Sequence, residues 1–380
     1  MRNSSLKNQK LAMNILFITN TLPPVVDGVG DYTLNLAREF ARHGHNVTVV
    51  CKRDDRVRTE YDDICVCPVV EAWNKATVGT VIQLINEKHI NIVSLQYVPH
   101  GYDNRGLPFA IAYLAKQIKK INVPLYTFFH EVCIGRGKWY QVHRNIGAFL
   151  MATIAKQIAS NSTFVGTSIE HYKKRLKKLH IEKVSLIPIP SNVPIVYATD
   201  SDKDKLKESI ACNEATIITL FGNRDFSVVI DAIKAIIKNG ANIKVIALGK
   251  ANASIPKEDF IYFTGPMEIE SLALYLQITD ILILPEDTSS GCSLKSGSLA
   301  AALQFGIPTI TMKGFMTDST LADLFLFAKE NSVDEYTILI NKLMENRVLA
   351  DELKNNSLEF AKHLTWRAVY DKYMNTLSTL

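Results

Sequence analysis

The sequence predicts an α/β protein with two doubly wound, parallel-sheet domains, and three observations carry this prediction. Short apolar runs alternate along the chain with amphipathic segments, which is typical of a parallel sheet with helices on both faces. The alternation breaks at "IPIPSNVP", residues 187–194, where three prolines exclude a helix interior. A chain of 380 residues is also too long for one hydrophobic core, so two domains are expected.

The elements follow in order. In the first half, strands are predicted at "NILFIT", "NVTVVC", "NIVSLQY", "VPLYTFFH" and "STFVGTS", with helices over residues 32–43 and "LPFAIAYLAKQIKK". In the second half, strands are predicted at "ATIITLFG", "NIKVIALG", "FIYFTG", "DILILP" and "IPTITM", with helices over residues 228–238, 269–277 and 298–305. The amphipathic end, "TWRAVYDKYMNTL", is long enough to reach back to the first half.

These elements predict a domain plan. A disordered leader, 1–12, precedes a first Rossmann-like domain, 13–195, and a charged linker, 196–214. A second Rossmann-like domain, 215–362, is followed by a C-terminal helix, 363–380, that packs on the first domain. Ligands of such sheets bind where loops and helix starts converge at the carboxyl ends of the strands, so the site is expected in a cleft between the two domains.

Composition excludes several classes of protein. The net charge of +5 is too small to call for nucleic acid as a partner, and no apolar run reaches membrane-spanning length. The six cysteines lack C-x-x-C spacing, which indicates reduced thiols of a cytoplasmic protein and neither a disulfide framework nor a zinc site. The basic start has no apolar core or cleavage site of a signal peptide.

The loop after the first strand, "NTLPPVVDGVGDYT", is the first candidate site. Gly28, Val29 and Gly30 lead into a helix that is expected to begin just after Gly30, but Thr33 occupies the third glycine position of a dinucleotide fingerprint. Backbone N–H groups at such a helix start suit an anionic ligand. On this interpretation a side chain at Gly30 blocks the ligand without disturbing the core; the alternative is that both glycines only make a tight turn.

Residues along nearly the whole chain resemble one family. "NILFITNTLPPVVDGVGDYTLNLAREFARHGHNVTVV", "SLQYVPHGYDNRGLP", "TFFHE", "IPIPSNVP" and "SLKSGSLAAALQFGIPTI" are similar, in this order, to retaining glycosyltransferases of family 4, which have the two-domain GT-B fold. The resemblance implies metal-independent transfer of a sugar, with retention, from a nucleotide diphosphate-sugar. UDP or GDP is the expected nucleotide, no cofactor is implied, and the expected acceptor is a glycan, a lipid-linked molecule or a small molecule in bacterial surface polysaccharide or glycoconjugate synthesis.

The sequence departs from the family pattern in its second half. The resemblance places glutamates at the positions of Ser293 and Ala301, and an Arg and a Lys after the first strand of the second domain, where only Arg224 is present. "SLKSGS" resembles a variant in which a cation and a helix start replace the first glutamate. Lys295 and the helix N-terminus at Gly297 would then face the donor phosphates.

The resulting candidates are few. His130, Arg224 and Lys295 are predicted to act on the donor, His130 through the sugar and the two cations through the diphosphate; the alternative for His130 is a satisfied core histidine. The predicted substrate-binding residues are Gly28, Val29, Gly30, Glu131, Gly222, Asn223, Ser293, Leu294, Ser296, Gly297 and Ser298. Glu286 and Asp287 either face a ligand or cap a loop.

The sequence leaves a choice among three functions, and it leaves the role of one surface undecided. Besides a glycosyltransferase, the sequence allows a nucleotide-sugar-binding protein that has lost catalysis, or another two-domain α/β enzyme such as a dehydrogenase. The basic run "YKKRLKKLH", residues 172–180, is a solvated helix face or a peripheral membrane contact on the inner face of the cell membrane, with few apolar side chains to support the latter. The sequence does not indicate an oligomeric state.

Overall fold

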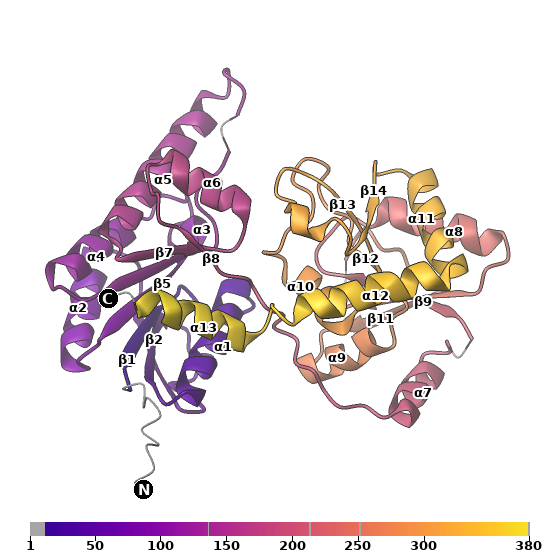
Figure 1. Cartoon of the computed structure of the whole chain (residues 1–380), viewed down its shortest axis with the longest axis horizontal. Coiled ribbons are helices and arrows are strands. Elements are labelled where there is room, and N and C mark those ends of the chain that lie inside the picture. The colour runs from indigo at the N-terminus through magenta and orange to yellow at the C-terminus, as the bar shows by residue number, and fades with distance from the viewer. Residues whose placement is uncertain (1–11, 136, 213, 251, 379–380) are drawn as a thin grey trace, which may run out of the picture. The chain divides into compact units, whose positions relative to one another are not determined.

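The computed structural model describes residues 12–135, 137–212, 214–250 and 252–378, so the predicted leader lies almost wholly outside the described residues. The chain forms two compact units. The N-terminal unit extends to Ser168 and includes residues 172–187 and the chain from Val369 onward. The C-terminal unit contains residues 169–171 and Pro188–Ala368. The two units are described separately below (Figure 1).

The N-terminal unit is a twisted sheet with helices on both faces. Its strands are β1 (Asn14–Ile18), β2 (Asn46–Lys52), β3 (Glu60–Tyr61), β4 (Ile64–Val70), β5 (Ile92–Tyr97), β6 (Leu125–Phe129), β7 (Phe164–Thr167) and β8 (Ser185–Leu186). Their spatial order is β3-β4-β2-β1-β5-β6-β7-β8, and β3 pairs antiparallel with β4 while the other pairs are parallel. The helices are α1 (Gly28–Arg42), α2 (Lys75–Glu87), α3 (Pro99–Tyr102), α4 (Phe109–Lys120), α5 (Val142–Asn161) and α6 (Glu170–Lys178).

The C-terminal unit repeats this architecture with a wholly parallel sheet. Its strands are β9 (Thr216–Phe221), β10 (Ile243–Leu248), β11 (Ile261–Gly265), β12 (Ile281–Ile283), β13 (Thr309–Met312) and β14 (Leu326–Ala328), in the order β11-β10-β9-β12-β13-β14. The helices are α7 (Asp200–Ser209), α8 (Ser227–Lys238), α9 (Ile269–Gln277), α10 (Gly297–Phe305), the 3₁₀ turn η1 (Ser319–Leu321), α11 (Val333–Glu345) and α12 (Arg347–Ala361).

Each sheet has a point where the winding direction reverses. In the N-terminal unit β1 lies between β2 and β5, and in the C-terminal unit β9 lies between β10 and β12. The loops that leave such a strand and its neighbour diverge to opposite faces of the sheet, which opens a crevice at their carboxyl ends. The loops after β1 and β9 are therefore the positions at which this fold builds ligand sites.

Three boundaries differ from the sequence-based expectation. Helix α1 begins at Gly28 and not after Gly30, because Asp27 is its N-cap. The second unit begins at Pro188 and not after residue 195. Within the segment expected to be a linker, 196–214, the structure contains α7, whose start is a capping box between Thr199 and Asp202.

The chain returns to the N-terminal unit through its last helix, α13 (Trp366–Leu377). Tyr370 lies edge-on to Phe40 of α1, and its hydroxyl is 3.1 Å from His45 Nε2. Tyr373 stacks on Tyr126 of β6 with ring centroids 4.2 Å apart. Both tyrosines are about 2% exposed, so α13 completes the core of a unit whose other elements lie at the opposite end of the sequence.

We expect Tyr373→Ala to destabilise the N-terminal unit by about 3–5 kcal/mol, because it removes a fully buried ring and leaves a cavity. Calorimetry measures this loss of stability as a lower temperature of thermal unfolding. Asn375→Ala changes an exposed residue of the same helix and should leave the transition in place. Equal transition temperatures for both variants would mean that α13 is not an integral part of the core.

Candidate functional site

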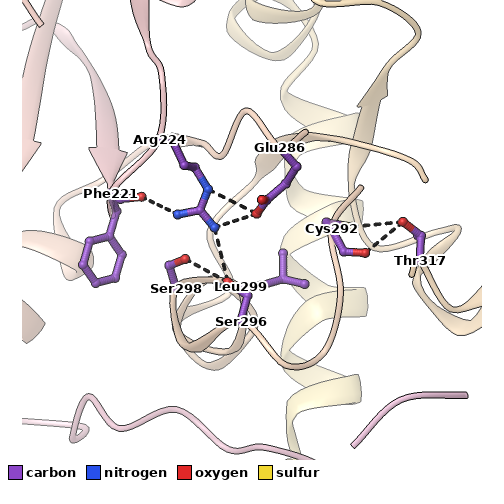
Figure 2. Close-up of polar contacts among 8 residues, drawn as sticks. All are labelled: Phe221, Arg224, Glu286, Cys292, Ser296, Ser298, Leu299 and Thr317. Carbon is purple, nitrogen blue, oxygen red and sulfur yellow. Dashed lines mark hydrogen bonds and ion pairs between the residues drawn. The ribbon is translucent and has the colours of Figure 1, made fainter. Parts of the chain in front are cut away.

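Arg224 is the centre of the arrangement that follows β9. Figure 2 shows its guanidinium between the end of β9 and the loop after β12. Nη1 donates to the carbonyl oxygen of Phe221 at 2.9 Å, and Nε and Nη2 donate to Oε1 of Glu286 at 3.1 and 2.6 Å. Nη2 also lies 3.3 Å from Oγ of Ser296, the N-cap of α10. Both charged side chains are largely buried, so one cation ties together two strand ends and a helix start.

Local geometry explains this position. Strand β12 pairs with β9, with Ile283 opposite Leu220, so the segments after the two strands emerge side by side. Gly222 has φ of +93°, a conformation that favours glycine. A Cβ on Gly222 would lie 2.4 Å from Nη1 of Arg224. Gly222 is therefore needed so that the chain can turn back and bring the arginine across the end of its own strand.

The start of α10 presents the features of an anion site. Oγ of Ser296 caps the helix by accepting from the N–H of Leu299 at 3.4 Å, and it lies 3.0 Å from Oγ of Ser298. Gly297 is exposed, and a Cβ there would meet no atom within 4 Å. The first N–H groups of a helix lack partners within the helix and sit at its positive end. The backbone of Gly297 and Ser298 is thus open to a negatively charged group.

The loop before α10 is held by the neighbouring strand end. Cys292 N donates to the carbonyl of Met312 at 2.8 Å, and Oγ1 of Thr317 donates to the carbonyl of Cys292 at 2.8 Å. Gly291 and Gly314 approach so closely that a Cβ on either would collide with the backbone of the other. This backbone contact fixes the path of the chain into α10.

Two positions at which the resemblance predicts glutamates are buried. Ser293 is 4% exposed, and Ala301 is fully buried in the core that α10 shares with the rest of its unit. A carboxylate at position 301 would have to be buried among apolar side chains, which is costly without a partner. Alanine therefore suits the apolar surroundings of position 301.

The remaining candidates of the C-terminal unit lie along the same edge. Lys295 and Leu294 are partly buried, and Asn223 is exposed. Glu286, whose role the sequence alone leaves open, is the partner of Arg224; its position after a short apolar strand was the available signal. Asp287 is a loop cap, since its Oδ1 accepts from the hydroxyl of Ser289 and from the N–H groups of Ser290 and Ser289, and these bonds lower the pKa of its carboxyl.

A polar cavity of about 580 Å³ lies at the other edge of the same sheet. It is lined by residues that precede or begin strands, including Thr216, Asp280 and Pro308. Its charged side chains have mixed signs, among them Lys207, Glu214, Asp280, Arg347, Asp351 and Lys354. The cavity is therefore not at the strand ends where the candidate site residues gather.

In the N-terminal unit, the two glycines of the first loop have different surroundings. Asp27 Oδ1 accepts from the N–H of Val29, and Gly28 is exposed, so that a Cβ added there would meet no atom within 4 Å. Gly30 is buried, and a Cβ there would lie 2.7 Å from the carbonyl oxygen of Thr21. The expectation that a side chain at Gly30 leaves the core undisturbed is therefore wrong, because this glycine lets α1 pack against its own preceding loop.

Asp31, in the first turn of α1, was not among the predicted site residues. Burial, with a smaller contribution from the charge of Asp27, raises the pKa of its carboxyl from 3.8 to about 6. A helix N-terminus by itself favours the ionised form, so the burial here outweighs the dipole. A carboxyl with such a pKa can exchange a proton near neutral pH.

His130 directly follows β6 and is 7% exposed. Its Nε2 lies 3.0 Å from Oε1 of Gln96, whose Nε2 donates to Ser94, so the histidine Nε2 is the protonated nitrogen and donates to Gln96. The ring lies edge-on to Tyr32 of α1 and to Phe128. Burial lowers the pKa of His130 to about 3, so the imidazole is neutral. The neighbouring Glu131 is partly buried.

These observations divide the predicted residues into two groups. One gathers at the end of β9 and the start of α10, and the other lies between the end of β6 and the start of α1. Within the described parts of the chain, no group of three or more His, Cys, Asp and Glu side chains is placed to hold a metal ion. None of the described helices is both long and apolar enough to cross a membrane.

A known protein family matches part of the chain. Residues 26–190 match the family model of Glycosyltransferase Family 4. The match covers less than half of the chain, and none of the curated proteins matches it significantly.

Solved structures resemble the chain over nearly its whole length. The structure of Anabaena HepE in complex with UDP and glucose has a TM-score of 0.70 at 14% identity, covering 97% of this chain and 100% of that one. Sucrose-phosphate synthase from Thermosynechococcus elongatus has a TM-score of 0.71 at 14% identity, covering 97% and 98%. The fold is GT-B. A UDP-N-acetylglucosamine 2-epimerase also matches, with a TM-score of 0.57 at 10% identity over 91% of each chain, so the likeness does not fix the reaction.

The two glycines provide a matched test of the α1 start. We expect Gly30→Ala to lower stability by about 1–3 kcal/mol, because the added methyl group collides with a backbone carbonyl. Gly28→Ala adds the same group to open space and should change stability by less than about 0.5 kcal/mol. Thermal unfolding of both variants measures the difference. If Gly30→Ala unfolds at the temperature of the unchanged protein, the close packing of this turn is not required.

Asp31 predicts a pH-dependent change in stability. Because its folded pKa is raised, the folded state binds the proton more tightly, and stability falls as pH rises from about 4 to about 6. Asp31→Asn should therefore raise the stability at pH 7.5 by about 1–2 kcal/mol, after allowance for partial exposure and the helix dipole. The gain should disappear near pH 3.5.

Asp334→Asn is the control for this test, since Asp334 lies in the first turn of α11 but is exposed. It should give no comparable gain at pH 7.5. A gain for Asp31→Asn that is the same at pH 3.5 and 7.5 would exclude titration of this carboxyl as its cause.

Proposed function

We propose that this chain is a glycosyltransferase that moves a sugar from a nucleoside diphosphate-sugar donor to an acceptor hydroxyl. The observation that carries the proposal is the convergence of Arg224, Ser296 and the open N–H groups of α10 at the reversal point of the C-terminal sheet. The family match of residues 26–190 supports the same activity from the other half of the chain. The UDP and UDP-glucose complexes of HepE support a nucleoside diphosphate as the donor group.

The proposed reaction needs stabilisation of a leaving group. The bond between the anomeric carbon and the diphosphate breaks, and the diphosphate leaves with the electron pair. The N–H groups of Gly297 and Ser298, together with Lys295, stabilise the charge that develops there. The acceptor oxygen bonds to the anomeric carbon on the same face, which retains the configuration, and its proton passes to the departing phosphate oxygen. This assignment requires neither a metal ion nor a pair of catalytic carboxylates.

Neutral His130 is proposed to contact the donor sugar. With Nε2–H directed at Gln96, its Nδ1 is a hydrogen-bond acceptor for a sugar hydroxyl. Because its pKa is about 3, protonation does not interrupt this role between pH 5 and 8. Its contribution is orientation of the sugar and not proton transfer.

A second candidate function is binding of a nucleotide-sugar without transfer. The buried Ala301 favours it, because the position at which the resemblance places a ribose-binding glutamate has no polar group and no access to a ligand. Arg224 also satisfies most of its N–H groups within the protein, which leaves fewer for a donor. Both features weaken the donor site relative to that of the family.

Calorimetric titration of the full chain with UDP, GDP, ADP and NAD tests the proposal. We expect a nucleoside diphosphate to bind, and Arg224→Ala and Lys295→Ala each to weaken its affinity by about 1–3 kcal/mol. Glu286→Gln should tighten binding about fivefold, because it removes a negative charge from the site and keeps an acceptor for Arg224. Lys238→Ala removes an exposed cation at the far end of α8 and is the matched control.

Turnover separates the candidates. Release of the nucleotide from a labelled donor together with a new glycosidic product supports the transferase, whereas binding without turnover of any donor supports the binding protein. Binding of NAD in preference to the diphosphates would support a dehydrogenase. Unchanged affinity in both Arg224→Ala and Lys295→Ala would remove the phosphate assignment.

A further inference from the structure

Helix α5 carries a stripe of exposed apolar side chains. Val142, Ile146 and Phe149 are 56%, 53% and 59% exposed, and their spacing of four and three residues puts them on one face of the helix. Just before the helix, Trp139 and Tyr140 are 88% and 58% exposed. Single exposed apolar residues need no explanation, but five of them within eleven residues are a concentration that indicates an interaction site.

The stripe leads into a groove between α5 and α6, which are neighbours in the N-terminal unit (Figure 1). Phe149 of the stripe lines this groove, whose volume is about 720 Å³. The lining residues are Cys133, Ile134, Gly135, Ala148, Phe149, Ala152, Thr153, Lys156, Arg175, Lys178, Leu179 and His180. Apolar and cationic groups are thus adjacent, and no acidic side chain is among the described residues of the lining.

The segment that carries the stripe has charged side chains of one sign. No aspartate or glutamate occurs between Glu131 and Glu170 in the sequence. Exposed cations lie on α5, on its preceding loop and on α6: Lys138, Arg144, Lys156, Lys174, Lys177 and Lys178. Two of them, Lys156 and Lys178, line the groove. Binding of a soluble protein does not require exposed apolar side chains together with only cationic ones. A lipid bilayer with anionic headgroups and an apolar interior matches both features.

The loop before α5 is hydrogen-bonded to both neighbouring helices. The loop before α5 is bonded to the helix, since Gly137 N donates to Oδ1 of Asn145 at 2.9 Å and Nε of Arg144 donates to the carbonyl of Gly135 at 3.2 Å. Nη1 of Arg175 in α6 donates to the carbonyl of Cys133. These bonds attach the loop that carries the aromatic residues to α5 and α6, which reduces the ordering cost of binding.

From these observations we infer that the α5 stripe and the α5–α6 groove dock this protein on the surface of an anionic lipid bilayer. The apolar side chains enter the acyl boundary, Trp139 and Tyr140 lie at the headgroup level, and the lysines contact lipid phosphates. The basic run of residues 172–180 has few apolar side chains of its own, and α5 supplies them. The inference does not depend on sugar transfer.

Vesicle binding by the full chain tests this inference. Vesicles of phosphatidylglycerol and phosphatidylcholine should bind the protein and shift the fluorescence of Trp139 to the blue, and vesicles of phosphatidylcholine alone should not. Trp139→Phe should remove the shift and so identify the reporter. Added salt should weaken binding, because the cations interact with the lipid charge within a Debye length.

Matched variants separate the two components of binding. The pair Ile146→Ser and Phe149→Ser should abolish the bound fraction, whereas Ile338→Ser, an equally exposed apolar residue of α11, should not change it. Lys174→Gln and Lys178→Gln should each weaken binding about fivefold, with Lys238→Gln as the control. All these residues are exposed, so the variants should fold, and their affinity for the nucleotide should be unchanged.

Several results would overturn the inference. These are equal binding to neutral and anionic vesicles, binding that the Ile146 and Phe149 pair does not reduce, and the absence of binding to anionic vesicles at low salt. Sedimentation velocity tests whether a second copy of this chain binds to the stripe. A dimer that dissociates when Ile146→Ser and Phe149→Ser are combined would assign the stripe to that second copy instead.

Discussion

A parallel sheet places the carboxyl ends of all its strands along one edge, and this constraint determines where the protein can act. Parallel strands need crossover helices, so each strand end is followed by a loop and a helix start at the same edge. At the reversal points, beside β1 and β9, these loops separate and leave the backbone accessible. The start of α1, His130 and the Arg224 arrangement all follow from this one property of the fold.

The ion pair of Arg224 and Glu286 then decides the shape of the C-terminal edge. A buried pair gains little net stability, because the desolvation of both charges offsets their attraction. Its importance is geometric, since the guanidinium fixes the end of β9, the loop after β12 and the N-cap of α10 in one arrangement. An incoming phosphate would find the helix start already in place, with Glu286 as the competing anion. This preorganisation is what electrostatic stabilisation of a leaving group requires.

The sequence predicts the layered architecture well, because alternation of apolar strands and amphipathic helices is a local property of the chain. Tertiary contacts cannot be predicted in this way. The pairing of Arg224 with Glu286 depends on β9 and β12 being neighbours, although 62 residues separate the two side chains. The role of Gly30 depends on the carbonyl of Thr21, and the glycine pattern alone resembles a ligand loop.

The sequence also contains two helix-capping signals that the composition of their segments outweighed in the prediction. Helix α7 has no buried residue, so its charged sequence resembles a linker, yet the spacing of Thr199 and Asp202 is that of a capping box. The start of α1 was misplaced in the same way: Asp27 is a good N-cap residue, but the glycines after it suggested a loop. In both cases a local capping rule was more reliable than the composition of the segment.

The family match lies in the first half of the chain, and in the second half α10 combines a helix start that suits a phosphate with a buried, apolar position. The family model matches residues 26–190, while the second unit retains the GT-B architecture. In α10 the backbone features that suit a phosphate, a serine cap and an open glycine at the first turn, are present. Ala301, at the position where the resemblance implies a ribose-binding glutamate, is instead part of the hydrophobic core. A helix start can bind a diphosphate without regard to the attached base and sugar, so under the proposed function the selectivity for a donor comes from residues outside α10.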